Sequence, residues 1–346
     1  MQKYSLTNNK NEEVKRVLVI QTAFIGDVIL ITPLIRGLKK VFPSAKIDVM
    51  VIPQTSEILD NNPNINQVIL FDKRSNKIKA FIKIAKVLRK NKYDIAISPH
   101  SSLTTALLMF VSDIPARIGF ARWSAQYFLT HKLTHIKNTF KIKKNLHLLS
   151  PFSDEEFSIQ TELFFREGMK LKADLLLSEF DSDVKKIIAV APGSMWFTKR
   201  WPLEFYKELV SKLSKNNYGI VFIGSKAEHQ ICEEVAPGKK FINLSGKLNL
   251  LESAAVINKC DLMVCNDSGA MHLANAVKTD VFVFFGPTVQ RIGYSPIGKN
   301  DVVFETELEC RPCGSHGSKK CPLKHFNCMR SIEPEFVYNQ IIKKLE

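Results

Sequence analysis

The sequence predicts an α/β protein with two doubly wound domains that face a cleft. Short β-branched apolar runs alternate with amphipathic stretches in both halves of the chain, which is typical of parallel strands covered by helices. A polar interval, roughly residues 134–183, interrupts this alternation once. With 346 residues, the chain is also too long for one ordinary core and fits two domains of common size.

In the first half, five apolar runs predict strands and two amphipathic stretches predict helices. Pro33 lies inside the first helical pattern, where it either kinks the helix or marks a restart. The predicted strands span residues 16–20, 46–52, 67–71, 94–99 and 116–120, and the predicted helices span residues 27–42 and 77–90.

The alternation resumes after the polar interval, and a last helical pattern follows a cysteine-rich region. We expect domains at residues 1–170 and 171–330, with residues 331–346 as a C-terminal helix that packs back onto one of them. The predicted strands span residues 186–192, 219–225, 241–245, 262–266 and 280–287, and the predicted helices span residues 203–213, 227–235, 250–258, 270–277 and 333–345.

The net charge of +15 has two interpretations. It reflects either solubility and a lysine-rich genome, or attraction to an anionic partner such as nucleic acid, a phosphorylated glycolipid or a membrane surface. Gln21, Gly26 and Asp27 interrupt the most apolar N-terminal stretch, which argues against a membrane span. The first sixteen residues are polar and charged, so we expect a cytoplasmic protein without a signal peptide, for which contact with a membrane face remains open.

The first chemical motif, residues 21–38, places Asp27 where a strand gives way to a helix. Asp27 either caps the helix or acts as a general base at the carboxyl end of the first sheet. The loop is not a G-x-G-x-x-G loop, which counts against a dehydrogenase.

The second motif, residues 191–209, follows a strand with a Pro-Gly-Ser turn. Ser194 and Lys199 are suited to contact phosphate, although Lys199 could equally be a solvated surface charge. Trp201 is interpreted as a packing residue that precedes a helix starting near Pro202.

The third motif, residues 265–277, is the most informative stretch, because a strand there ends in Asn-Asp-Ser-Gly and turns into a helix. Backbone N–H groups at such a helix start can hold phosphate. Asp267 and Ser268 can cap the helix, Asp267 could instead bind sugar hydroxyls, and Gly269 allows close backbone approach. His272 on this helix is either a ligand contact or an ordinary helix histidine.

Four of the seven cysteines cluster near the C-terminus, with His316 and His325 nearby. Zinc suits such a set, but the second half lacks a close C-x-x-C pair, so reduced structural cysteines without a metal are favoured. The four are Cys310, Cys313, Cys321 and Cys328.

Taken together, GDVILITPLIRGL, PGSMWFTKRWP, CNDSGAMHLANAV, FFGPT and the CRPCG segment resemble the ADP-heptose:lipopolysaccharide heptosyltransferases, and the heptosyltransferase II branch in particular. The resemblance covers roughly residues 16–343. It implies a GT-B type fold and an inverting, metal-independent transfer from ADP-L-glycero-D-manno-heptose. The acceptor would be the anionic inner core of lipopolysaccharide, at the cytoplasmic face of the inner membrane.

The resemblance also implies roles for single residues. Asp27 matches the catalytic base, and Lys199 matches the lysine that neutralises the departing diphosphate. Arg117 and Arg122 could meet acceptor carboxylates or phosphates, or they are ordinary surface charges. The stretch 243–247 is a candidate for adenine contacts. The implied donor-binding residues are Ser194, Asp267, Ser268, Gly269 and His272.

Two other functions remain open from the sequence. One is a related nucleotide-sugar glycosyltransferase that acts on a different glycan or on a protein. The other is a basic, zinc-containing nucleic-acid-binding protein, which the charge and the cysteines favour. No helix-turn-helix or RNA-binding sheet motif is recognisable, and the positive charges are scattered, so we expect no nucleic-acid partner.

Overall fold

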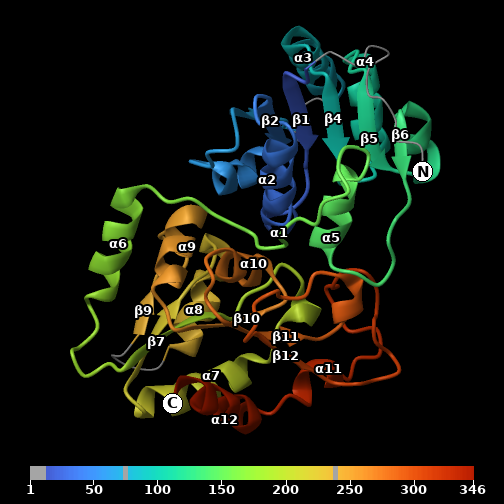
Figure 1. The fold of residues 1–346 in the computed structure, drawn as a ribbon. Helices are drawn as coiled ribbons and strands as arrows, with labels where there is room; N and C mark the ends of the chain where they lie inside the picture. Colours follow the sequence, from blue (N-terminus) through green and yellow to red (C-terminus); the bar gives the residue numbers. More distant parts are fainter. Residues whose placement is uncertain (1–12, 73–76, 237–240) are drawn as a thin grey trace. The chain divides into compact units, whose positions relative to one another are not determined.

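The computed structural model describes residues 13–72, 77–236 and 241–346. The chain divides into two compact units, with the boundary in the sequence between Phe164 and Phe165. Each unit holds a six-stranded parallel sheet with helices packed against it (Figure 1), which confirms the predicted α/β class. The boundary expected at residue 170 falls within α6 (Glu167–Leu177), which packs against α9 (Leu250–Asn258) of the second unit.

The sheet of the first unit has the strand order β3-β2-β1-β4-β5-β6. The chain starts in the middle, runs to one side and then returns past β1, so the strand order reverses between β1 and β4. The elements are β1 Arg16–Ile20, α1 Ile25–Ile29, α2 Thr32–Val41, β2 Lys46–Val51, η1 Pro53–Leu59, β3 Gln67–Leu70, α3 Lys77–Asn91, β4 Ile95–Ser98, α4 Leu103–Val111, β5 Ala116–Phe120, η2 Trp123–Phe128, β6 His131–Leu133, α5 Lys141–Leu146 and η3 His147–Leu149.

A core cluster of the first unit lies between one face of its sheet and the layer formed by α3, α4 and η2. Leu18 and Ile20 of β1 point into it, as the alternation of side chains along a strand requires. Ile84 and Leu88 of α3 reach it from the helix side, one turn apart. This packing defines which face of α3 is buried and which faces solvent.

The helix predicted over residues 27–42 is two helices, α1 and α2. Pro33 occupies the first turn of α2, where a missing N–H costs little, whereas in mid-helix it would break a hydrogen bond. The restart is therefore the correct alternative. It leaves Asp27 in the first turn of α1, whose N-cap is Phe24, and no side chain caps that helix end.

Asp48 of β2 is the buried polar centre of the first unit. Its carboxylate is fully enclosed and accepts hydrogen bonds from Arg16, Asn66 and Gln67 at 2.8, 2.7 and 2.8 Å. The hydroxyl of Tyr93 donates to it at 2.6 Å, and burial together with this bond raises the pKa of Tyr93. A buried charge with this many donors is compensated, but losing the carboxylate would strand all of its partners.

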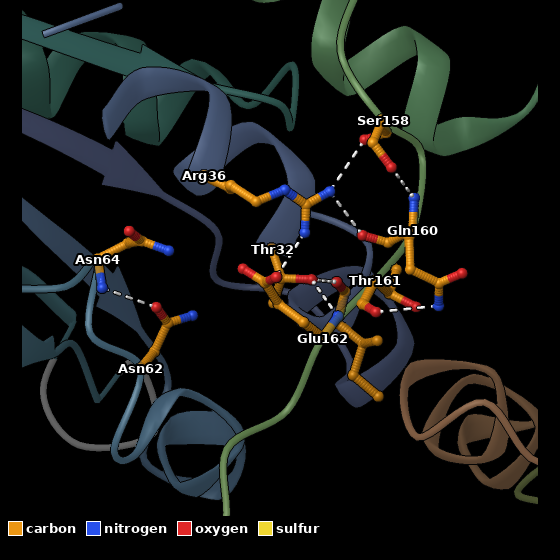
Figure 2. Close-up of polar contacts among 9 residues, drawn as sticks. Thr32, Arg36, Asn62, Asn64, Ser158, Gln160, Thr161 and Glu162 are labelled. Carbon is orange, nitrogen blue, oxygen red and sulfur yellow. Dashed lines mark hydrogen bonds and ion pairs between the residues drawn. The ribbon is translucent and has the colours of Figure 1, made fainter. Parts of the chain in front are cut away.

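The extended chain that leads out of the first unit is bound to α2 (Figure 2). The Thr32 hydroxyl accepts a hydrogen bond from the backbone N–H of Glu162 at 3.1 Å. Arg36 forms an ion pair with the Glu162 carboxylate and donates to the backbone carbonyl of Gln160 at 2.9 Å. These contacts hold the segment before Phe164 on the first unit.

The sheet of the second unit has the order β12-β11-β10-β7-β8-β9, which repeats the same winding. Besides α6 and α9, its elements are β7 Lys186–Ala191, η4 Phe197–Lys199, α7 Leu203–Lys215, β8 Tyr218–Phe222, η5 Lys226–Glu228, α8 His229–Val235, β9 Phe241–Asn243, β10 Leu262–Asn266, α10 Gly269–Ala276, β11 Val281–Phe285, η6 Gln290–Ile292, β12 Val302–Glu305, α11 Asn327–Arg330 and α12 Pro334–Leu345. The last helix, α12, packs against α7.

Trp201 is the centre of the second core, as the packing interpretation predicts. Its ring stacks on Phe284 at 4.3 Å between centroids and meets Tyr206 edge-on at 5.0 Å. The indole N–H donates to the backbone carbonyl of Ile332 at 2.9 Å, which satisfies the buried polar atom.

Among the α-helices and strands of the described residues, six were not predicted: β6, β12, α4, α5, α6 and α11. None of the helices in residues 13–72, 77–236 and 241–346 combines the length and the apolar character needed to cross a bilayer.

We predict that Asp48→Ala lowers the free energy of unfolding by about 3–5 kcal/mol, because it leaves several buried donors without an acceptor. Urea denaturation followed by circular dichroism measures this loss. Tyr93→Phe is the control and should cost less, about 2 kcal/mol, since it removes the hydrogen bond to Asp48 and the one from Asn91 but leaves the other donors of Asp48 paired. A loss below 1 kcal/mol for Asp48→Ala would contradict the role given to this carboxylate.

Candidate active site

The candidate active site of the second unit lies at the edge where its parallel strands end. Because all six strands point the same way, the loops that follow β7, β8, β10 and β11 emerge at this one edge. The sequence-predicted donor residues belong to the loop after β7, to the turn after β10 and to α10, which follows that turn. The fold thus brings together two motifs that lie about seventy residues apart in the chain.

Asn266, the last residue of β10, ties these two loops together. Its side chain is fully buried, and its amide nitrogen donates to the backbone carbonyls of Pro192 and Gly193 at 2.9 and 3.1 Å. Its side-chain oxygen accepts the backbone N–H of Trp201 at 2.9 Å and the Tyr206 hydroxyl at 3.2 Å. The two ends of the loop after β7 are therefore both anchored to one amide group.

Lys199 and Asp267 form a nearly buried ion pair at this edge. The Lys199 ammonium group lies 2.5 Å from Oδ2 of Asp267, and their side chains are 13% and 7% exposed. The Thr288 hydroxyl, from the loop after β11, donates to the same oxygen at 2.7 Å. Removing water strengthens the attraction between the two charges, so the ammonium group is held in one position.

The turn after β10 leads directly into α10. Ser268 is the N-cap residue and Gly269 is the first helical residue, and no side chain caps this helix end. The first N–H groups of α10 are thus available to an anion, which the positive end of the helix dipole also attracts. His272 is buried further along α10, with its ring 6.4 Å from that of Tyr294.

Ser194 lies buried in the loop after β7, and its backbone carbonyl accepts a hydrogen bond from Arg200 at 2.8 Å. Glu228, after β8, lies so close to Gly193 that any side chain at that glycine would collide with its carboxylate. Glu228 accepts hydrogen bonds from the backbone N–H and the hydroxyl of Ser225 at 2.8 and 2.7 Å. A carboxylate therefore borders the candidate phosphate loop.

Arg311 fixes the loop after β11 through hydrogen bonds to its backbone. Its guanidinium group, 4% exposed, donates to the backbone carbonyls of Phe285, Gly286 and Thr288. The backbone N–H of Cys313 adds a bond to the Pro287 carbonyl at 2.9 Å. The cysteine-rich segment thereby shapes the loop that carries Thr288.

The same segment also reaches the turn that carries Lys199. Thr198 and Ser318 exchange backbone and hydroxyl hydrogen bonds of 2.7–3.1 Å. A side chain at Gly317 would strike Trp196 and the aliphatic stem of Lys199. The backbone at Gly317 thus packs closely on the aliphatic stem of Lys199, while Asp267 binds the ammonium group at its end.

The four C-terminal cysteines are reduced. Burial raises the pKa of Cys328 to about 11 and also raises that of Cys313, so both thiols stay protonated at neutral pH. Within the part of the chain that the structure describes, no three histidine, cysteine or acidic side chains gather in a way that could hold a metal ion.

In the first unit, Asp27 lies half-buried at the carboxyl edge of the first sheet, near a group of basic residues. Burial lowers the pKa of Lys141, an effect that the negative charge of Asp27 opposes. Burial also lowers the pKa of His135, which the positive charges of Lys141, Arg122 and Lys144 lower further. These charges are close enough to act on one another, so the edge combines one carboxylate with several cations.

Arg117, a predicted acceptor contact, is occupied by the fold itself. Its guanidinium group donates to the backbone carbonyls of Phe128 and Ile114 at 2.6 and 2.5 Å and lies over the ring of Phe110. It braces β5 against α4 and η2, which is a structural role within the first unit. Arg122 lies in the short loop after β5 as the N-cap residue of η2, and its side chain makes no capping hydrogen bond there.

Sequence reasoning missed Asn266, Thr288, Glu228 and Arg311 at the candidate site of the second unit, and Lys141 at the edge of the first. Asn266 and Thr288 stand inside quoted motifs, and their position at strand ends was a usable signal. The roles of Arg311 and Lys141 depend on long-range contacts for which the sequence carries no local pattern.

Comparisons with known proteins identify the family of this chain. Residues 81–325, more than half of the chain, match the model of glycosyltransferase family 9 (heptosyltransferase). Lipopolysaccharide heptosyltransferase 3 of Escherichia coli K12 is 30% identical over 299 residues, which are 81% of this chain and 84% of that relative.

Two solved structures share the fold. The family 9 glycosyltransferase of Veillonella parvula is 25% identical with a TM-score of 0.83, covering 96% of this chain and 98% of that chain. The ADP-heptose lipopolysaccharide heptosyltransferase II of E. coli is 24% identical with a TM-score of 0.79, covering 95% and 98%. With two Rossmann-like units of the GT-B type and a family match over most of its length, this chain belongs to glycosyltransferase family 9, the heptosyltransferase family.

Proposed function

We propose that this glycosyltransferase moves heptose from ADP-L-glycero-D-manno-heptose to the inner core of lipopolysaccharide, with inversion at the anomeric carbon and without a metal ion. The observation that carries the proposal is the buried Lys199–Asp267 pair beside the start of α10. The E. coli relatives support the choice of substrates, since both are named lipopolysaccharide heptosyltransferases and one is named for ADP-heptose.

In this proposal Lys199 and the first N–H groups of α10 neutralise the donor diphosphate. When the bond between heptose and ADP breaks, negative charge develops on the departing phosphate oxygen. A lysine already held in place meets this charge without reorganisation, which favours the transition state. We assign Ser194, Ser268 and Gly269 to the diphosphate and His272 to the same donor pocket.

Asp267 has two tasks in the proposal. In the free protein it positions Lys199, and the Thr288 hydroxyl fixes the orientation of its carboxylate. When the diphosphate binds, Lys199 gains a second anionic partner, and the carboxylate can accept hydrogen bonds from heptose hydroxyls.

We assign Glu228 to the ribose of the donor. In doubly wound sheets an acidic residue after the second strand commonly binds ribose hydroxyls, and Glu228 follows the second strand of this unit and borders its phosphate loop. Residues 243–247, at the end of the next strand, remain the candidate for adenine contacts.

On the acceptor side, Asp27 is the proposed general base, which takes the proton of the attacking hydroxyl. Arg122, Lys141 and Lys144 would attract the carboxylates or phosphates of the inner core to this edge. His135 lies close to these cations. Its ring is fixed in position by stacking on Phe120, with the two centroids 4.2 Å apart.

The proposed location is the cytoplasm, with the protein peripheral to the inner membrane, where the lipid-linked acceptor lies. The net charge of +15 supports attraction to an anionic surface. Nucleic acid is not a partner in this proposal.

We predict that ADP-heptose raises the thermal midpoint by about 5 °C or more at saturation, whereas UDP- and GDP-sugars leave it unchanged. A thermal-shift series with each nucleotide sugar measures this selectivity. A larger shift with a UDP- or GDP-sugar would favour a related transferase with another donor.

We predict that Asp27→Asn lowers kcat by a factor of about 100 to 10,000 and leaves ADP-heptose binding within twofold, because a general base acts in the chemical step. Steady-state kinetics and calorimetry measure the two quantities. Asp60→Asn, an exposed carboxylate of the same unit, is the matched control and should change neither. Near-normal turnover by Asp27→Asn would remove this residue from the mechanism.

We predict that Lys199→Gln weakens ADP binding and lowers kcat by a factor of about 100 to 1,000. The substitution also leaves the buried Asp267 carboxylate without its cationic partner, which lowers stability. The double variant Lys199→Gln/Asp267→Asn should therefore regain stability but not activity. Lys207→Gln is the exposed control in the same unit. Recovery of turnover in the double variant would show that leaving-group stabilisation lies elsewhere.

A further inference from the structure

The outer layer of the first unit exposes an unusual number of large apolar side chains. Trp123 and Tyr127 of η2 are 80% and 78% exposed, and Ile78 of α3 is 73% exposed. The layer continues through exposed residues Leu103 and Phe110 of α4. Since α3 packs against α4 and α4 packs against η2, these side chains belong to neighbouring elements of one layer (Figure 1). Apolar exposure on this scale marks an interaction surface more often than a passive one.

The same layer is strongly basic. The fifteen-residue helix α3 carries six basic residues and no acidic residue. With Ile84 and Leu88 buried beneath it, the helical period of 3.6 residues puts Lys79, Lys83 and other lysines on the solvent side. Four lysines form this outward row, and all four are exposed: Lys79, Lys83, Lys86 and Lys90.

Apolar residues border the lysine row of α3 on both sides. Ile78 and Ile82, one turn apart, run along one border, and exposed Val87 lies on the other, beside exposed Leu70 at the end of β3. The helix therefore offers ammonium groups and aliphatic side chains on the same outward face. Lysine stems can lie along apolar surface while their charged ends stay in water.

We propose that this face, formed by α3, α4 and η2, docks on an anionic lipid bilayer. Lysines of α3 would meet lipid phosphates, and the isoleucines and aromatic rings would enter the boundary between headgroups and acyl chains. Tyrosine and tryptophan favour this boundary because they combine an apolar body with a polar tip. The biological purpose, presenting a lipid-linked acceptor to the enzyme, rests on the proposed function, whereas the binding itself does not.

Other partners fit this face less well. Nucleic-acid interfaces are polar and positively charged, and they do not need a border of isoleucines and exposed aromatic rings. A second copy of this chain would bring one lysine row against another, and like charges repel. A bilayer with anionic headgroups satisfies both the charge and the apolar side chains.

The test is co-sedimentation of the full chain with vesicles at 0.15 M NaCl. One vesicle type is pure phosphatidylcholine, and the other contains about 30% phosphatidylglycerol, a composition chosen to give a negative surface potential. We expect binding to the second type only, weakening as salt rises. Failure to bind anionic vesicles would overturn the proposal, as would stronger binding to single-stranded DNA than to vesicles.

Two variants test the face itself. Lys79→Gln/Lys83→Gln should weaken vesicle binding about 30-fold, since each lysine near an anionic surface contributes about 1 kcal/mol. Ile78→Ser/Ile82→Ser should weaken it by about tenfold or more through lost apolar insertion. Circular dichroism and the thermal midpoint check that both variants keep the fold.

Matched controls come from exposed residues of the second unit. Lys207→Gln/Lys215→Gln makes the same charge change, and Leu171→Ser/Leu175→Ser makes the same apolar change. Equal losses in variants and controls would overturn the assignment to this face. Turnover of ADP-heptose with a deacylated, water-soluble acceptor should stay normal in all four variants, so a failed docking face is distinguished from a failed heptosyltransferase assignment.

Discussion

One amide group organises the second unit. Asn266 is buried at the end of β10, and its four hydrogen bonds connect the loop after β7 with the start of α7. Any side chain that filled this space without both a donor and an acceptor would leave several backbone groups unsatisfied in a dry core. The positions of Ser194 and Lys199 depend on this loop, so the chemistry at the surface depends on a residue that touches no solvent.

The ion pair between Lys199 and Asp267 also follows from the parallel arrangement of the strands. Parallel strands deliver their loops to one edge, so a lysine after the first strand of the unit can meet an aspartate after a strand much later in the chain. The pair is buried and hydrogen-bonded, which lets the charges persist where a lone charge would be expelled or neutralised. Arg311 supports the arrangement by fixing the loop that carries Thr288.

Much of this organisation could be predicted from the sequence, because strand periodicity and motif order are local signals. The strands at residues 16–20 and 262–266 match the structure at both ends, and Pro33 marked a real helix restart. Short or polar elements could not be predicted. The three residues of β6, for example, carry two basic side chains and show no apolar run.

Long-range partners could not be predicted. The sequence left Arg117 as either an acceptor contact or an ordinary surface charge, yet its guanidinium group donates to the backbone carbonyls of Phe128 and Ile114, which no sequence pattern reveals. Lys141 lies in the polar interval, and its link to Asp27 arises only when α5 packs against α2. Residue type and spacing therefore predicted which residues form the candidate site, whereas the charge interactions among them became visible only in the fold.

The cysteine-rich segment has a consequence for synthesis of the chain. Lys199 leaves the ribosome well over a hundred residues before Ser318 and Ile332, yet Thr198 pairs with Ser318 and the Trp201 indole with Ile332. The first unit of a nascent chain can fold early, because all of its residues have been synthesised once Phe164 is added. The candidate donor site of the second unit, by contrast, can be completed only after Ser318 and Ile332 have been synthesised.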